Sequence, residues 1–90
     1  MNSYRTDVGA IRKKMKEKKI KTILELSNVS GIGRRTLSKV LNEEVQPSSD
    51  TMEKLIFCLD ITPEEAGSIF LNKYYLVRKI IRVDLLKKYG

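Results

Sequence analysis

The side chains that could carry chemistry in this chain are mainly basic, because the usual catalytic and metal-binding residues are scarce. The 90 residues include no histidine and a single cysteine, Cys58. Zinc fingers, Ser/His/Asp triads, Cys/His nucleophile pairs and disulfide frameworks are therefore excluded. We expect no catalysis, no metal and no cofactor. Cys58 follows an apolar run and is expected to be a buried, unreactive thiol.

Basic residues outnumber acidic ones and are concentrated at the two ends of the chain. Eighteen Lys and Arg against eleven Asp and Glu give a net charge of +7. Residues 1–44 hold eleven basic and five acidic side chains, residues 45–67 hold one and five, and residues 68–90 hold six and one. Such a footprint is typical of nucleic-acid binding, since neutralised phosphates release condensed counterions. A basic surface that is merely solvated is the alternative.

The length of the chain predicts one small domain with a single core. The longest uninterrupted apolar run is far shorter than the roughly 20 residues that span a bilayer, and the N-terminus lacks the apolar stretch of a signal peptide. We therefore expect a cytoplasmic protein that does not enter a membrane.

The spacing of apolar residues predicts short helices and no strand, an all-α fold. The first helix begins at Asp7, and the second is capped by Thr22 and stops near Ser30. Gly33 opens a third helix, whose apolar residues recur at positions i, i+3 and i+4. Asn42 is expected to end that helix in a left-handed conformation.

Two further helices are predicted after a proline-containing loop. Ser48 is the expected N-cap of the fourth helix. Thr62, Pro63 and Glu65 form the strongest helix start in the chain, with a capping residue, a proline in the first turn and a capping-box glutamate. Residues 71–90 contain no internal proline or glycine and are predicted to form an additional C-terminal helical segment, apolar on two sides.

The most informative unit is TILELSNVSGIGRRTLSKVL, residues 22–41. The small side chain of Ser27 lets two helices cross closely, and Gly31 supplies the left-handed turn conformation. Ile32 is placed to fill the angle between the helices, while Leu37 and Val40 anchor the second one. This spacing describes a helix-turn-helix.

At these residues the chain resembles the repressor and Cro-type helix-turn-helix family, whose members are five-helix DNA-binding domains. The resemblance covers roughly residues 7–70 and includes Pro47 in the loop after the second helix of the motif. The sequence departs from the family at Ile23, where a glutamine is usual, at Gly33, where Ser or Thr is usual, and at Glu43, where a glycine is usual.

The resemblance implies a double-stranded DNA partner and assigns site residues. Arginine forks match the O6 and N7 acceptors of guanine in the major groove. The implied base contacts are Arg34, Arg35, Ser38 and Lys39, and the implied phosphate contacts are Thr22, Thr36, Asn42 and Gln46.

The resemblance also implies a dimer, because one recognition helix covers only a few base pairs and two copies read adjacent half-sites. We expect a flexible arm over residues 1–6, the DNA-binding domain over residues 7–70 and a dimerising extension over residues 71–90. The interface residues expected on that extension are Leu71, Tyr75, Val83 and Leu86.

The function that follows is a sequence-specific transcriptional regulator, a phage or bacterial repressor that occupies an operator as a homodimer. The alternative is a protein-interaction module, such as an antitoxin or an adaptor for a regulatory protein, that keeps the fold and uses Ile23, Leu24 and the C-terminal extension against a partner.

Overall fold

The computed structural model describes residues 5–71, which form an all-helical domain without strands. The helices are α1 (Val8–Glu17), α2 (Ile23–Ser30), α3 (Arg34–Leu41), α4 (Ser49–Cys58) and α5 (Pro63–Phe70). The predicted five-helix fold is confirmed. The C-terminal helical segment predicted after Leu71 lies outside the described residues, as do residues 1–4 of the predicted arm.

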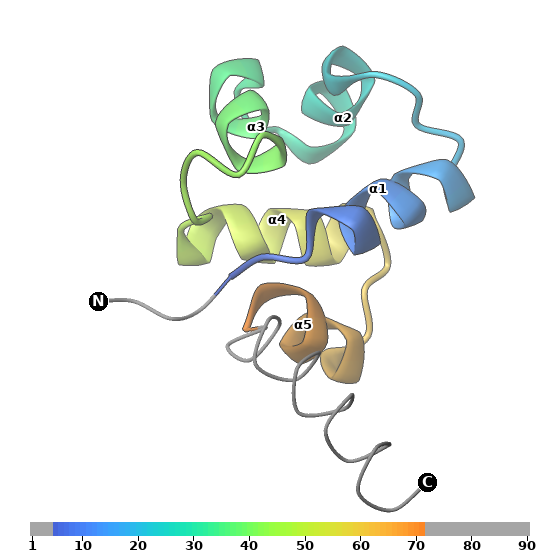
Figure 1. Ribbon diagram of the computed structural model, residues 1–90. Coiled ribbons are helices and arrows are strands. Elements are labelled where there is room, and N and C mark those ends of the chain that lie inside the picture. The colour runs from blue at the N-terminus through green and yellow to red at the C-terminus, as the bar shows by residue number, and fades with distance from the viewer. Residues whose placement is uncertain (1–4, 72–90) are drawn as a thin grey trace, which may run out of the picture.

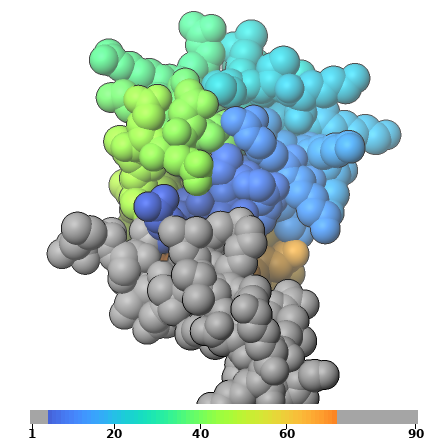
Figure 2. All heavy atoms as spheres, viewed as in Figure 1, coloured from blue at the N-terminus to red at the C-terminus, as the bar shows by residue number. Residues whose placement is uncertain are grey.

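The helices are stacked in layers around α4 (Figure 1). α2 and α3 lie together on one side of α4, α5 lies on the opposite side, and α1 crosses in front of α4. α2 packs against both α3 and α4, and α1 packs against α5. The packing of α2 on α4 thus places α2 and α3 at one end of the molecule, where their outer faces are open (Figure 2).

The core is built from one apolar stripe of each helix. Its largest fully buried side chains come from α1 to α4 and the residue that ends α4, and they are Ile11, Leu26, Leu37, Val40, Leu55 and Leu59. α5 closes the core with Ile69 and Phe70. Truncating a buried leucine of this kind to alanine costs about 2–5 kcal/mol, so each of these core positions matters to the stability of the domain.

Four of the five helices begin with a side-chain cap. Asp7, Thr22, Ser48 and Thr62 each accept a hydrogen bond from the backbone N–H three residues later. Thr62 and Glu65 complete the predicted capping box, with Pro63 in the first turn. Each such cap contributes about 1 kcal/mol, which is substantial for a domain with so small a core.

Three helices end in left-handed residues that are not glycine. Lys19, Glu43 and Asp60 have φ values of 61°, 60° and 51°. In each case the next residue donates its N–H five residues back, from Ile20 to Met15, from Glu44 to Lys39 and from Ile61 to Ile56. This is the Schellman arrangement, in which the last helical carbonyls are satisfied by a residue just past the end.

The expectation that Asn42 takes the left-handed conformation is wrong. Asn42 has φ −92°, and Glu43 is the left-handed residue. The Schellman arrangement requires the conformational reversal one residue beyond the C-cap, and the helix runs to Leu41, so Asn42 occupies the C-cap itself. The usual glycine of the family falls at Glu43, the position with positive φ.

Thr6, which the sequence placed in the arm, is buried against the body of the domain. Its Oγ1 donates to Gln46 Oε1 at 2.6 Å, and the N–H of Asp7 donates to the carbonyl of Ile69 at 2.7 Å. The chain entering α1 is therefore attached to the loop after α3 and to the end of α5.

Cys58 is half-buried, less than the sequence suggested. Its Sγ lies 3.8 Å from the carbonyl of Leu55, and burial raises the pKa of the thiol. A raised thiol pKa lowers the thiolate fraction and so fits an unreactive side chain.

Within residues 5–71, no helix is long and apolar enough to cross a bilayer.

Two ion pairs tie α1 to the second half of the domain. Lys14 Nζ lies 2.7 Å from Glu65 Oε2, and Lys18 pairs with Asp60. The hydrogen bond from Lys14, together with that from the backbone N–H of Thr62, lowers the pKa of Glu65 from its ordinary value of 4.5 to about 2.

We predict that this carboxylate makes the domain acid-sensitive. Because the pKa of Glu65 is lower in the folded chain than in the unfolded chain, its contribution to stability is complete above pH 4.5 and is lost as the pH falls toward 2. Urea unfolding of the wild type and of Glu65→Gln, measured between about pH 6 and pH 2, should show a gap in midpoint that closes in the acid range. A gap that stays constant with pH would contradict the assignment.

Candidate nucleic-acid interface

The turn between α2 and α3 is held by a buried isoleucine whose peptide groups are hydrogen-bonded on both sides. Ile32 is buried and belongs to the core of the domain. Ser27 Oγ donates to the carbonyl of Ile32 at 2.6 Å, and the N–H of Ile32 donates to Ser30 Oγ at 3.1 Å. Because the apolar side chain and both polar backbone groups are satisfied together, α3 is fixed in one orientation against α2.

Gly31 reverses the chain ahead of this isoleucine. It ends α2 with φ 77°, and its N–H donates to the carbonyl of Ser27 at 2.9 Å. A Cβ built on Gly31 would meet no atom within 4 Å. The requirement for glycine is therefore conformational and not steric.

α3 is divided into a buried and an exposed face, as the sequence predicted. Leu37, Val40 and Leu41 are buried in the core. Of the predicted contact residues on the helix, Arg34, Arg35 and Thr36 are exposed, while Ser38 and Lys39 are half-buried. The predicted base-contact side chains are thus carried by a single short helix whose other side is anchored.

Arg34 and Arg35 occupy the first turn of α3, just after the N-cap Gly33. Gly33 provides no side-chain cap, so the first amides of α3 are left for other acceptors. Neither arginine forms an ion pair within residues 5–71. Two uncompensated guanidinium groups at a helix N-terminus oppose the helix dipole, and an anionic or electron-rich acceptor would relieve that repulsion.

The residues predicted to contact phosphate differ in how much freedom they retain. Thr22 Oγ1 accepts from the N–H of Glu25 at 3.1 Å and lies 3.4 Å from the Glu25 carboxylate, so a negative charge already stands at the start of α2. Asn42 is exposed and donates from Nδ2 to Ser38 Oγ at 3.3 Å. Gln46 is held by Thr6.

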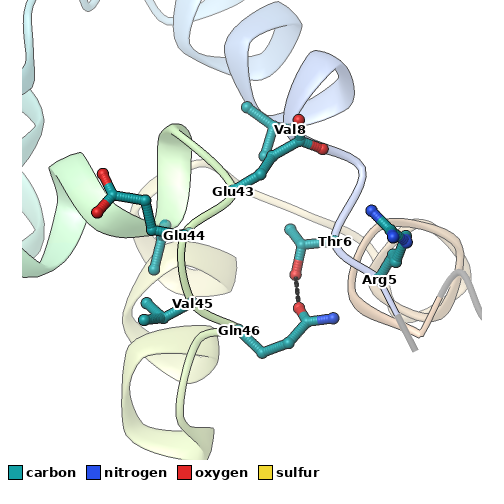
Figure 3. A pocket seen from close by; sticks show the side chains of 8 residues that line it. Arg5, Thr6, Val8, Glu43, Glu44, Val45 and Gln46 are labelled. Atoms are coloured by element: carbon teal, nitrogen blue, oxygen red, sulfur yellow. Dashed lines mark hydrogen bonds between the residues drawn. The ribbon is translucent and has the colours of Figure 1, made fainter. Parts of the chain in front are cut away.

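The loop after α3 and the segment before α1 enclose a small open pocket of about 250 Å³ (Figure 3). Thr6 and Gln46 face each other across it, and Arg5 lies beside them. Glu43 and Glu44 lie on the other side of the pocket and are exposed. Sequence reasoning missed the bond between Thr6 and Gln46, because nothing local signals a contact between residues 40 positions apart.

α1 also contributes to the placement of α3. Arg12 Nη2 reaches the carbonyl of Leu41 in the last turn of α3, at 3.4 Å. A cation at this end of a helix is favourable because the last carbonyls are unsatisfied and carry partial negative charge. Arg12 was not singled out by the sequence, which indicated only a charged face of α1.

The remaining predicted site residues belong to the extension. Leu71 is exposed, and Tyr75, Val83 and Leu86 lie outside the described residues. No group of three or more potential metal ligands occurs in the described part of the chain.

Five short helices, with a turn around the buried Ile32 between α2 and α3, define a helix-turn-helix domain. The family model of the Cro/C1-type HTH DNA-binding domain matches residues 10–67, and the chain belongs to this family. The match spans α1 to the middle of α5 and confirms the resemblance read from residues 22–41 and the loop that follows. Searches of curated proteins and of solved structures gave no match.

We predict that the turn depends on glycine at only one of its two glycine positions. Gly31→Ala should lower the free energy of unfolding by about 1 kcal/mol, because a side chain disfavours positive φ. Gly33→Ala is the matched control, because Gly33 has φ −61°, which alanine adopts without strain. The poorer N-cap preference of alanine is offset by the roughly 0.4–1 kcal/mol gained when alanine stiffens the unfolded chain, so the change should stay within about 0.5 kcal/mol. Urea denaturation measures both, and equal losses would contradict a conformational role for Gly31.

We predict that Glu43→Gly stabilises the domain. Relief of the left-handed conformation, worth about 1–2 kcal/mol, exceeds the roughly 0.4–1 kcal/mol lost because glycine loosens the unfolded chain. The free energy of unfolding should therefore rise by about 0.5 kcal/mol.

Glu44→Gly is the control for this change, because it removes the same charge from a residue without positive φ. It should destabilise the domain by about 0.5–1 kcal/mol. Chemical denaturation of the two variants should thus give shifts of opposite sign, and shifts of the same sign would refute the strain at Glu43.

Proposed function

We propose that the protein is a sequence-specific regulator that places α3 in the major groove of double-stranded DNA. The observation that carries the proposal is the exposure of Arg34 and Arg35, without ion-pair partners among residues 5–71, on the first turn of a helix anchored by its opposite face. Membership of a DNA-binding family supports the same assignment. Ser38 and Lys39, one turn further along α3, extend the base-contacting surface.

The phosphate contacts are proposed at Thr22, Thr36, Asn42 and Gln46, which lie at the start of α2, on α3 and in the following loop. Glu43 and Glu44 adjoin the last two and repel phosphates, so the loop holds the backbone less tightly than a glycine-containing loop would. Specificity then depends more on α3 than on the loop.

We further propose that the protein acts as a repressor, as a homodimer on an operator with two half-sites. A domain with an eight-residue recognition helix reads only a few base pairs, and a second copy adds both affinity and symmetry. The dimer contacts are proposed at Leu71, Tyr75, Val83 and Leu86.

A protein-interaction module is the second candidate, and one observation favours it. Leu24 is 51% exposed and Ile23 is half-buried at the start of α2, where the family usually has a polar phosphate contact. An apolar surface at this point suits a protein partner better than a phosphate.

The two functions are separated by alanine substitution of the arginines. The DNA is a site recovered by the protein from a random pool, and binding is measured by fluorescence anisotropy. If each arginine contacts a base, Arg34→Ala and Arg35→Ala should each weaken binding to that site by about 5- to 150-fold, corresponding to 1–3 kcal/mol.

Lys13→Ala is the matched control, because Lys13 is an exposed cation on α1. Lys13→Ala should have the same effect on the affinity for the selected site as on the affinity for unrelated DNA. Equal losses for all three variants, or the absence of any preferred site, would reject sequence-specific binding by α3.

A further inference from the structure

An exposed groove with a lining of apolar and charged side chains lies between α2 and α4, and none of the residues proposed to contact DNA lines it. It measures about 370 Å³ and is bordered by Val29 of α2 and Phe57 of α4. Val29 is 57% exposed and Phe57 is 86% exposed. Apolar side chains that gather on a surface mark interaction sites, and aromatic residues are frequent anchors of such contacts.

The rim of this groove carries uncompensated negative charge. Asp50 and Glu53 line it together with Lys54. Lys54 Nζ pairs with Asp50 at 3.0 Å, whereas Glu53 is exposed and has no ion pair in the described part of the chain. The groove therefore suits a ligand that is apolar and basic.

The chain itself contains a segment of that chemistry. Residues 72–90 hold six basic side chains and one acidic one among many large apolar residues. Their apolar residues include Tyr75, Val83 and Leu86, whereas the residues 45–67 that contain α4 carry a net negative charge. The charge and apolar character of the segment complement those of the groove.

The direction in which the chain leaves the domain favours a second copy as the source of this segment. α5 lies on the side of α4 opposite α2 (Figure 1). Near its end, the carbonyl of Ile69 is bonded to Asp7 at the start of α1. The segment after Leu71 thus starts on the other side of α4 from the groove.

We propose that residues 72–90 of one copy bind the groove between α2 and α4 of a second copy. The exchange is reciprocal, as two-fold symmetry requires. This inference deepens the proposed dimer and rests on it, but it is independent of DNA contacts by α3. Failure of the arginine test above leaves it intact, and its own failure leaves DNA binding intact.

The first experiment is sedimentation of the full-length chain over a range of concentrations. The wild type should form dimers, and Phe57→Ser should weaken the dimer at least tenfold, as expected for an anchor residue. Val45→Ser is the matched control, since Val45 is also an exposed apolar residue but lies outside the groove, and it should leave the dimer unchanged. Circular dichroism checks that both variants fold.

A monomeric wild type would overturn the proposal, and so would equal effects of the two serine substitutions.

The second experiment traps the contact directly, because Cys58 lines the groove and is the only cysteine of the chain. In Tyr75→Cys, oxidation at alkaline pH, which populates the Cys58 thiolate despite its raised pKa, should link the introduced thiol to Cys58 of the other copy, which peptide mass spectrometry identifies.

Lys73→Cys is the control for this trapping, since position 73 lies outside the apolar stripe that contains Tyr75. It should give little of the linkage to Cys58. Equal trapping from both positions, or a disulfide within one chain, would reject binding of the segment by a second copy.

Discussion

The orientation of α3 depends on the burial of Ile32 and on the two serine hydroxyls that bond its peptide groups. The isoleucine is buried in the core, while Ser27 and Ser30 bond its carbonyl and N–H. A buried peptide group without such partners would cost about 1–3 kcal/mol, so the turn has little freedom to open. The exposed side chains of α3 are positioned by the same packing, because the buried face of α3 belongs to this core.

Ion pairing divides the basic residues of the domain into two groups. Lys14 of α1 and Lys18, the C-cap of that helix, pair with carboxylates of the second half of the chain, Glu65 and Asp60. The arginines of α3 have no such partners within residues 5–71. Part of the positive charge thus holds the helices together, and part of it remains on the surface proposed to bind DNA.

The local features of the fold were predictable from the sequence because they depend on neighbouring residues. Caps at Thr22, Ser48 and Thr62 follow from side chains bonding amides three residues away, and the glycine turn follows from its φ preference. The left-handed residue after α3 was assigned to Asn42 on residue type alone. Its position at Glu43 depends on how the last carbonyls of the helix are satisfied.

Contacts between distant segments could not be predicted in the same way. Arg12 reaches Leu41 and Thr6 reaches Gln46 only because the helices pack as they do. For the candidate site, periodicity separated the exposed from the buried side of α3. It did not show that Phe57, within an apolar run of α4, faces outward.

The non-glycine residues with positive φ at the helix ends are positions where substitution can raise the stability of this domain. Lys19, Glu43 and Asp60 lie in three separate loops, and changes at distant sites combine nearly additively. Only one of the three adjoins the surface proposed for DNA. Selection for growth at higher temperature can therefore act on the loops after α1 and α4 without altering the surface proposed to bind DNA.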